Sequence, residues 1–150
     1  MLAMTSEVMD APAPTRQGSV RRSCRRATTE IPMHDPNAVA AAYLATWNEA
    51  DPTRRSDLLR TAWSEDADYT DPMMKGCGHD GIAAMIAGAR DRFPGHSFRL
   101  HGTPDGHGDV VRFSWTLVSP EAARVAGGTD VVRLDPDGRI ASVTGFLDAA

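Results

Sequence analysis

The stretch Asp68-Tyr69-Thr70-Asp71-Pro72, near the middle of the chain, joins a short predicted strand to a polar loop. Proline disfavours helical backbone in the residue before it, so Asp71 should lie at the extended end of that strand. Apolar segments flank the stretch on both sides. A carboxylate that faces an apolar cavity from this position is a candidate general base, whereas the simpler interpretation is that Asp-Pro only starts a turn.

The composition is that of an ordinary globular protein. Of 150 residues, 41% are hydrophobic and 24% are charged, which is enough for one domain with a single core. No run approaches the roughly 18 apolar residues that a membrane span requires, and no apolar run follows the arginines around Cys24. Cys24 and Cys77 are far apart in unlike surroundings, so they suggest neither a disulfide nor a metal site. We therefore expect a cytoplasmic protein with no membrane partner.

Residues 1–33 differ from the rest of the chain. They are poor in large apolar side chains and show no hydrophobic period, so we predict a disordered extension before a domain at 34–150. Met33 directly precedes that domain and could be an alternative start. The extension carries five arginines against three acidic residues, whereas the domain carries 11 basic and 17 acidic ones. An acidic domain argues against nucleic acid as the main partner.

Two helices are predicted in the first half of the domain. Asp35-Pro36 and Asp51-Pro52 each place a capping residue before a proline at the first helical position. The first helix should end near Glu49. Residues at four-residue spacing form its buried face: Val39, Tyr43 and Trp47. The second helix should bury a stripe made of Leu58, Leu59, Ala62 and Trp63.

A short strand, a loop and a third helix should follow. The strand is predicted at 67–70 and leads into Asp71, and the loop is predicted at 73–80. Asp80 is then expected to cap the third helix, which should end before Pro94. The apolar positions of this helix are Ile82, Met85, Ile86, Ala89 and Phe93.

From His96 onward the hydrophobic period changes from 3.6 to 2, which predicts strands. The predicted strands include residues 96–101, 111–117 and 139–147, and a further strand that follows the turn at 119–123 and contains Asp130, Val132 and Leu134. The other turns are predicted at 102–108 and 135–138. Because helices precede strands that are joined by hairpin-like turns, we predict an α+β domain. Its antiparallel sheet should curl around the helices.

Asp130 is the unusual residue of the late strands. It shares a strand face with Val132 and Leu134, so it should project into the apolar interior, where a carboxylate needs a partner or a proton. Bulky apolar residues predicted to line a pocket there are Trp47, Trp63, Met85, Phe98, Phe113, Trp115, Val132 and Leu147. His96 has the same parity as Phe98 and could line it too. Aromatic stripes of this kind can also form the core instead of a ligand site.

Four segments resemble the nuclear-transport-factor-2-like superfamily, to which the SnoaL-like polyketide cyclases and the ketosteroid isomerases belong. They are Tyr43–Asn48, Trp63–Pro72, Thr129–Leu134 and Gly138–Ile140, and the similarity extends over about residues 36–148. The resemblance implies a cone, in which a strongly bent antiparallel sheet is closed by three N-terminal helices around one deep pocket. The fold hosts enzymes and passive binders alike, so it does not by itself imply a reaction.

In the ketosteroid isomerase pattern, a helix tyrosine, an aspartate before proline and an aspartate on a late strand form the catalytic site. Here these positions hold Tyr43, Asp71 and Asp130. The resemblance implies that Asp71 moves a proton from a carbon next to a carbonyl group, while Tyr43 and a neutral Asp130 donate hydrogen bonds to the enolate oxygen. It also implies a small hydrophobic substrate, no cofactor, and a homodimer through the convex sheet face. The residues expected on that face are Arg112, Ser114, Thr116, Val131 and Arg133.

Three alternatives stay open at this point. SnoaL-like cyclases use a pocket aspartate, here Asp130, for an aldol closure. A non-catalytic module would bind a small apolar molecule or a protein partner, and the aspartates would only hold the cavity mouth together. An epoxide-hydrolase-like reaction would need an arginine between two aspartates, but the only inner-strand candidate, Arg112, should point outward. The spacing of His79, His101 and His107 suggests no metal site.

Overall fold

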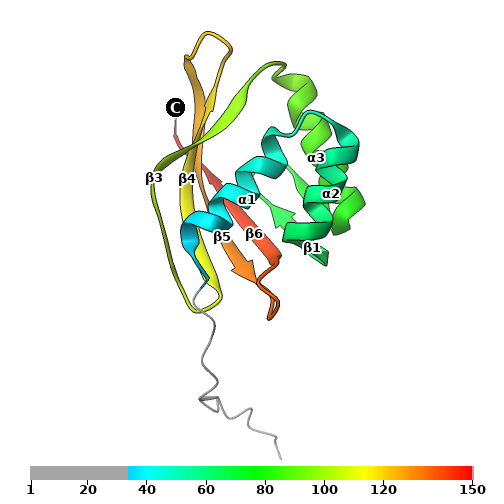
Figure 1. Cartoon of the computed structure of the whole chain (residues 1–150). Helices are drawn as coiled ribbons and strands as arrows, with labels where there is room; N and C mark the ends of the chain where they lie inside the picture. Colours follow the sequence, from blue (N-terminus) through cyan, green and yellow to red (C-terminus); the bar gives the residue numbers. More distant parts are fainter. Residues whose placement is uncertain (1–33, 150) are drawn as a thin grey trace, which may run out of the picture.

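Three helices lie against one face of a bent six-stranded sheet (Figure 1). The structure, a computed structural model, describes residues 34–149, and the extension predicted at 1–33 lies outside the described residues. The helices are α1 (Pro36–Asn48), α2 (Pro52–Ala62) and α3 (Gly78–Arg92); the strands are β1 (Trp63–Thr70), β2 (Lys75–Cys77), β3 (Ser97–His107), β4 (Val110–Val118), β5 (Arg124–Leu134) and β6 (Ile140–Leu147). The predicted α+β class is confirmed.

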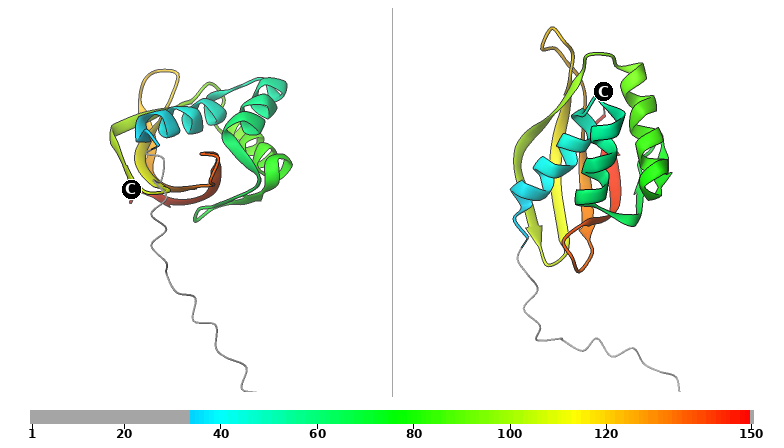
Figure 2. Two further views of the ribbon diagram at one scale, coloured as in Figure 1. Left: turned by 60° about the horizontal axis from the view of Figure 1, so that its bottom comes forward. Right: turned by 45° about the vertical axis from the view of Figure 1, so that its right-hand side comes forward.

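The strands follow the order β2-β1-β6-β5-β4-β3, and the sheet is curved and open (Figure 2). Every neighbouring pair is antiparallel except β1 and β6, which run parallel. The sheet is therefore mixed where a wholly antiparallel one was predicted. A parallel pair needs a long crossover, which the chain between β1 and β6 supplies. Register shifts interrupt the β3–β4, β4–β5 and β5–β6 pairs and increase the local twist, so the sheet curls around the helices.

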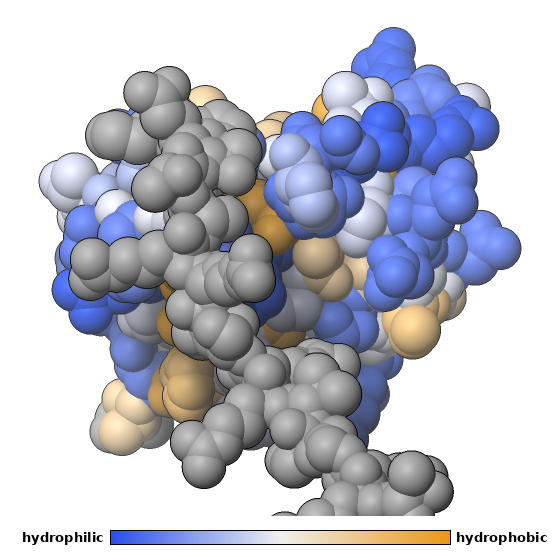
Figure 3. All heavy atoms as spheres, turned by 90° about the horizontal axis from the view of Figure 1, so that it is seen from below, coloured by the Kyte–Doolittle hydropathy of each residue, from blue (hydrophilic) through white to orange (hydrophobic). Residues whose placement is uncertain are grey.

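The two faces of the sheet have different surroundings. Inward residues of β4 and β5 are buried, and outward ones are exposed or half-buried: Arg112, Ser114, Thr116, Val131 and Arg133. In the view from below, hydrophilic residues gather on both sides of the molecule, and smaller hydrophobic patches show between them and at the edges (Figure 3). Within residues 34–149, no helix has the length and apolar character of a membrane span.

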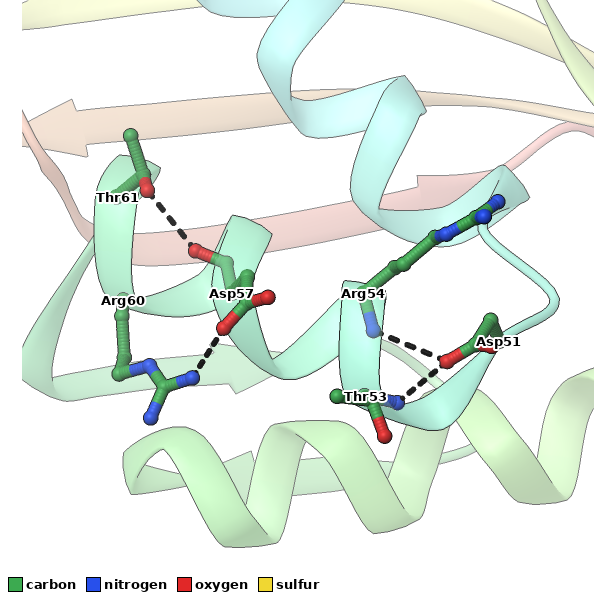
Figure 4. A network of polar contacts seen from close by, with 6 residues as sticks. All are labelled: Asp51, Thr53, Arg54, Asp57, Arg60 and Thr61. Carbon is green, nitrogen blue, oxygen red and sulfur yellow. Dashed lines mark hydrogen bonds and ion pairs between the residues drawn. The ribbon is translucent and has the colours of Figure 1, made fainter.

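Local polar contacts within α2 and its capping residue stabilise this helix (Figure 4). Oδ1 of Asp51 accepts hydrogen bonds from the backbone N–H groups of Thr53 at 2.8 Å and Arg54 at 3.1 Å, as the sequence predicts for a capping residue before proline. These bonds lower the pKa of the Asp51 carboxyl. Further along the helix, Arg60 pairs with Asp57 one turn earlier. The start of α2 is therefore fixed by its own sequence.

Trp63 belongs to a strand and not, as predicted, to the second helix. The helix ends at Ala62, and Trp63 begins β1, four residues earlier than expected. Its ring is fully buried, and its indole Nε1 donates to Oγ1 of Thr46 at 3.2 Å. Because a helix and a strand would each bury a tryptophan at this position, hydrophobic periodicity could not distinguish them.

Three further boundaries differ from the prediction. Residues 75–77 form β2, which pairs with β1, where a loop was expected. Helix α3 begins at Gly78, so Asp80 lies in its first turn and does not cap it. Strand β3 continues through the expected turn at 102–108, because a register shift between His101 and Asp105 accommodates the turn-forming residues within the β3–β4 pair.

Asn48, the last residue of α1, fixes that helix to the sheet. Its Nδ2 donates to the carbonyl oxygen of Phe98 at 2.8 Å, and its Oδ1 accepts from the N–H of Phe98 at 2.8 Å. The side-chain amide thus takes the place of a neighbouring strand beside β3. The guanidinium of Arg55 donates twice to the carbonyl oxygen of Glu49, at 3.0 and 2.8 Å, and holds the end of α1 against α2. These contacts set the position from which Tyr43 projects.

Replacing Asn48 with alanine should lower the free energy of unfolding by about 2 kcal/mol, because two partly buried backbone groups of Phe98 lose their partner. Asn37→Ala is the matched control, since Asn37 is exposed on the same helix and should change stability by less than about 0.5 kcal/mol. Urea unfolding followed by circular dichroism measures both variants. Equal effects would contradict the role given to Asn48.

Candidate functional site

A cavity of ≈ 140 Å³ opens between α1, the end of α3 and the concave face of the sheet. A volume of this size holds about one aromatic ring. Most of the wall is apolar, and its hydroxyl and charged groups are two phenols, one carboxyl and one guanidinium. The lining residues are Tyr43, Trp47, Tyr69, Asp71, Met73, Met74, Ala89, Arg92, Phe93, Phe98, Trp115, Leu117, Ala126 and Leu147.

Tyr43 and Asp130 form a buried pair at the inner end of the cavity. The Tyr43 ring stacks on Trp63 with a centroid distance of 5.6 Å and meets Phe113 edge-on at 4.9 Å. The Tyr43 hydroxyl donates a hydrogen bond to Oδ2 of Asp130, which is 1% exposed. Oδ1 of Asp130 is also buried and has no hydrogen-bond partner. A neutral carboxyl tolerates such an environment better than a carboxylate does.

Burial separates the proton affinities of this pair. Removal from water raises the pKa of Asp130 to about 6, and the negative charge of Asp71 adds to the rise, while the neighbouring donors of Tyr43 and Trp115 oppose it. Burial also raises the pKa of Tyr43 well above its usual value, and the charge of Asp130 raises it further. Tyr43 therefore keeps its proton, and the group that titrates near pH 6 is Asp130.

Asp71 lies directly after β1, at the edge of the cavity. Its Oδ1 accepts from the backbone N–H groups of Met73 at 2.7 Å and Met74 at 2.8 Å, and its Oδ2 accepts from the Tyr69 hydroxyl at 2.7 Å. The Asp-Pro pair thus starts a turn and also presents a carboxylate to the cavity. Burial, followed by the charge of Asp130, raises the pKa of Tyr69 and keeps it a hydrogen-bond donor.

Gly145 makes room for these groups to meet. It lies opposite Asp130 in the β5–β6 pair. A Cβ atom on Gly145 would lie 2.9 Å from Oδ1 of Asp130, 3.0 Å from Cβ of Asp71 and 3.4 Å from the Tyr69 hydroxyl. Any larger residue would therefore push the two acids apart. The absent side chain lets both acids and Tyr69 converge on one point.

The structure places only part of the predicted lining around the cavity. Four predicted residues line it: Trp47, Phe98, Trp115 and Leu147. Trp63, Phe113 and Val132 are buried in the core and do not reach the cavity. Asp130 is not a lining residue either and lies next to the cavity behind Tyr43.

The remaining candidates lie elsewhere. Met85 lines a neighbouring hollow beside α3. His96 is held by its Nδ1 contact with the carbonyl oxygen of Pro94 and does not line the cavity. Arg112 is exposed and pairs with Asp105 on the outer face, so it cannot bridge Asp71 and Asp130. Within residues 34–149, no group of three His, Cys, Asp or Glu residues is placed to hold a metal ion.

Sequence reasoning did not include Tyr69 among the site residues. Its alternation with Ala67 along β1 is a signal for an inward position, and both residues are buried. The lining residues Met73, Met74 and Arg92 were also missed, because they lie in a loop and at a helix end. Neither place has a hydrophobic period that would indicate which way a side chain points.

Known proteins resemble this chain over most of the described domain. The SnoaL-like domain family matches residues 40–143. A candidate isomerase of the SnoaL-like family from Agrobacterium tumefaciens str. C58 is 57% identical, with a TM-score of 0.74 over 75% of this chain and 97% of that chain. An NTF2-like protein of unknown function from Exiguobacterium sp. 255-15 is 19% identical, with a TM-score of 0.59 over 75% and 99% of the two chains. A candidate polyketide cyclase from Sinorhizobium meliloti is 16% identical, with a TM-score of 0.57 over 75% and 99%. The last two show likeness of fold alone. No curated protein matches the chain.

Asp130→Asn should remove a pH-dependent cost of burial. The pKa of about 6 in the folded protein exceeds the ordinary value of 3.8, so the stability from protonated Asp130 is complete below about pH 4 and is lost as pH rises through about 6. At 1.36 kcal/mol for each pKa unit, the loss is on the order of 3 kcal/mol. Asparagine is neutral throughout, so the free energy of unfolding of the variant relative to wild type should rise by about this amount from about pH 4 to about pH 8. Urea unfolding measures it, and a difference independent of pH would contradict the raised pKa.

Proposed function

The chain belongs to the SnoaL-like domain family, and from this membership we propose that it is a cofactor-independent acid/base enzyme that shifts protons on a small hydrophobic carbonyl compound. One observation carries the proposal. Two carboxyl groups and two phenols, from α1, β1, the turn after β1 and β5, meet beside an apolar cavity. The similarity to a candidate isomerase from Agrobacterium tumefaciens supports an isomerase among such enzymes. An aldol closure of the cyclase kind would begin with the same proton removal.

Asp71 is the proposed base. It lines the cavity, and donors from Met73, Met74 and Tyr69 hold its carboxylate in one orientation. A carboxylate offers about four lone-pair sites, so three donors leave one for the substrate proton. A fixed base next to a bound ketone replaces a bimolecular proton transfer by one within the complex.

Tyr43 is the proposed donor to the enolate oxygen, and Asp130 acts behind it. Tyr43 lines the cavity and Asp130 does not, so their hydrogen bond decides where the Tyr43 proton points. An ionised Asp130 accepts a hydrogen bond from the Tyr43 hydroxyl, which turns the phenolic proton away from the substrate. A protonated Asp130 can instead donate to the Tyr43 oxygen, which leaves the phenol free to donate into the cavity. This relay replaces the direct donation by Asp130 that the sequence led us to expect.

A non-catalytic binding module is the second candidate, because the same contacts can be purely structural. All three hydrogen bonds of Asp71 hold the turn at the cavity edge. In that case the apolar cavity would take up a small hydrophobic molecule without changing it. The two functions differ in one measurable property, which is exchange of the protons next to a carbonyl group.

Asp71→Asn should lower the rate of that exchange by about 10²- to 10⁴-fold, because an amide cannot accept the proton. The measurement follows loss of the α-proton signal of single-ring ketones in D₂O by nuclear magnetic resonance. Asp68→Asn is the matched control, since Asp68 is exposed on β1, the strand that ends just before Asp71, and should leave the rate unchanged. Exchange that survives Asp71→Asn, or that no ketone of the panel shows with wild-type protein, would favour the binding module.

The pH dependence should reveal the relay through Asp130. If only protonated Asp130 frees the Tyr43 hydroxyl, kcat/KM for exchange should fall as pH rises through about 6, the pKa of the free protein. Asp130→Asn should remove this decline, because its amide can donate at every pH. Rates measured from about pH 5 to about pH 9 test both proteins. A decline that persists unchanged in the variant would assign it to another group.

A further inference from the structure

The cavity has one positive charge, and it lies at the outer end. Among the described lining residues, Arg92 is the cationic one and Asp71 the anionic one. Tyr43 and Tyr69 are each 3% exposed and mark the inner end. Arg92, by contrast, is exposed and also lines the neighbouring hollow beside α3. The guanidinium therefore belongs to the solvent-exposed part of the lining, and the two phenols belong to its buried part.

The mouth around Arg92 is otherwise apolar. Met73 is 66% exposed, and Phe93 and Leu147 are each 39% exposed, although all three line the cavity. In Figure 1 the end of α3, the start of β3 and the end of β6 lie at the same upper end of the molecule. Large exposed apolar side chains around an opening are typical of a binding site for a hydrophobic molecule. A charge among them selects for a molecule that also carries an opposite charge.

Arg92 has no partner of its own among residues 34–149. Its side chain makes no hydrogen bond or ion pair within this range. The side chain of Arg90, two residues earlier, donates to the carbonyl oxygen of Trp47 at 3.0 Å. Both arginines lie in the last turn of α3, where a positive charge is favoured by the helix dipole. The dipole accounts for a cation at this helix end, but it does not account for a guanidinium placed over an apolar opening.

We propose that the substrate of this site is an amphipathic anion: a ring-sized apolar carbonyl compound whose carboxylate or similar acidic group binds Arg92 at the mouth. This inference rests on the proposed function and names its substrate class. The carbonyl end enters toward Tyr43 and Asp71, the apolar part fills the ≈ 140 Å³ cavity, and the anionic end stays near solvent. Arg92 is then the residue that decides specificity, because a guanidinium binds a carboxylate through paired hydrogen bonds and an apolar wall does not.

The test compares two phenols that differ only at the end of the chain. Phenols mimic an enolate oxygen and fit the ring-sized cavity, so the ligands are 3-(4-hydroxyphenyl)propionate and uncharged 4-propylphenol. Isothermal titration calorimetry at low salt and about pH 7.5 should show that wild-type protein binds the propionate about fivefold more tightly, as for a solvent-exposed ion pair. The preference should shrink in about 0.5 M NaCl, because salt screens the charge.

Arg92→Gln should abolish the preference, because the propionate then binds no more tightly than 4-propylphenol does. Arg92→Lys should keep part of it, since a point charge remains. Arg99→Gln is the matched control, because Arg99 is exposed on β3 and its loss changes the net charge equally without touching the cavity. A preference that Arg92→Gln and Arg99→Gln reduce alike would overturn the proposal. So would a wild-type protein that binds the two phenols equally or binds neither.

Failure of this inference and failure of the proposed function give different results. If wild-type protein prefers the propionate but Asp71→Asn leaves proton exchange unchanged, the site selects anionic hydrophobic molecules without this chemistry. If Asp71→Asn abolishes exchange but Arg92→Gln has no effect on the preference, the proposed function holds and only the proposal that Arg92 binds an anionic group is wrong.

Discussion

The buried hydrogen bond from Tyr43 to Asp130 is the interaction on which the rest of the site depends. A carboxyl group that is 1% exposed has lost its water, and only one of its oxygens has a partner in the protein. Tyr43 can supply that partner only if α1 lies close against the concave face of the sheet. The Asn48 side chain secures this approach by pairing with the backbone of Phe98 at the start of β3. The position of α1 thus decides whether the buried Asp130 carboxyl has a hydrogen-bond donor.

The two acids of the site have unlike surroundings although they lie close together. Backbone N–H groups and Tyr69 surround Asp71 at the cavity edge, whereas Asp130 lies behind the wall and accepts a hydrogen bond from Tyr43. Burial raises the pKa of Asp130 to about 6, and the charge of Asp71 contributes to that rise. An acid that is neutral at a mildly acidic pH beside another that accepts three hydrogen bonds is a suitable pair for moving protons. Gly145 permits the pairing because it has no side chain.

Much of the fold could be predicted from residues that act locally. Asp51 before proline starts α2, and the alternation along β4 and β5 gives the inward and outward faces as observed. The predictions that failed concern contacts between distant segments. Trp63 is buried in either a helix or a strand, and strand β2 exists only because β1 offers it a partner. The register shift that carries β3 through its glycines depends in the same way on β4.

The sequence by itself determined the fold class, the family and the positions of Tyr43, Asp71 and Asp130, because these follow from capping residues, periodicity and spacing along the chain and from the family resemblance they support. Only the tertiary structure decided that Tyr69 contacts Asp71, that Asp130 lies behind Tyr43, and that Trp63 and Phe113 belong to the core and not to the cavity wall. The physical reason is that periodicity tells which side chains point inward but not how far inward each one lies. Depth follows from how α1 and the curved sheet approach each other, and that distance is set by contacts such as the one between Asn48 and Phe98.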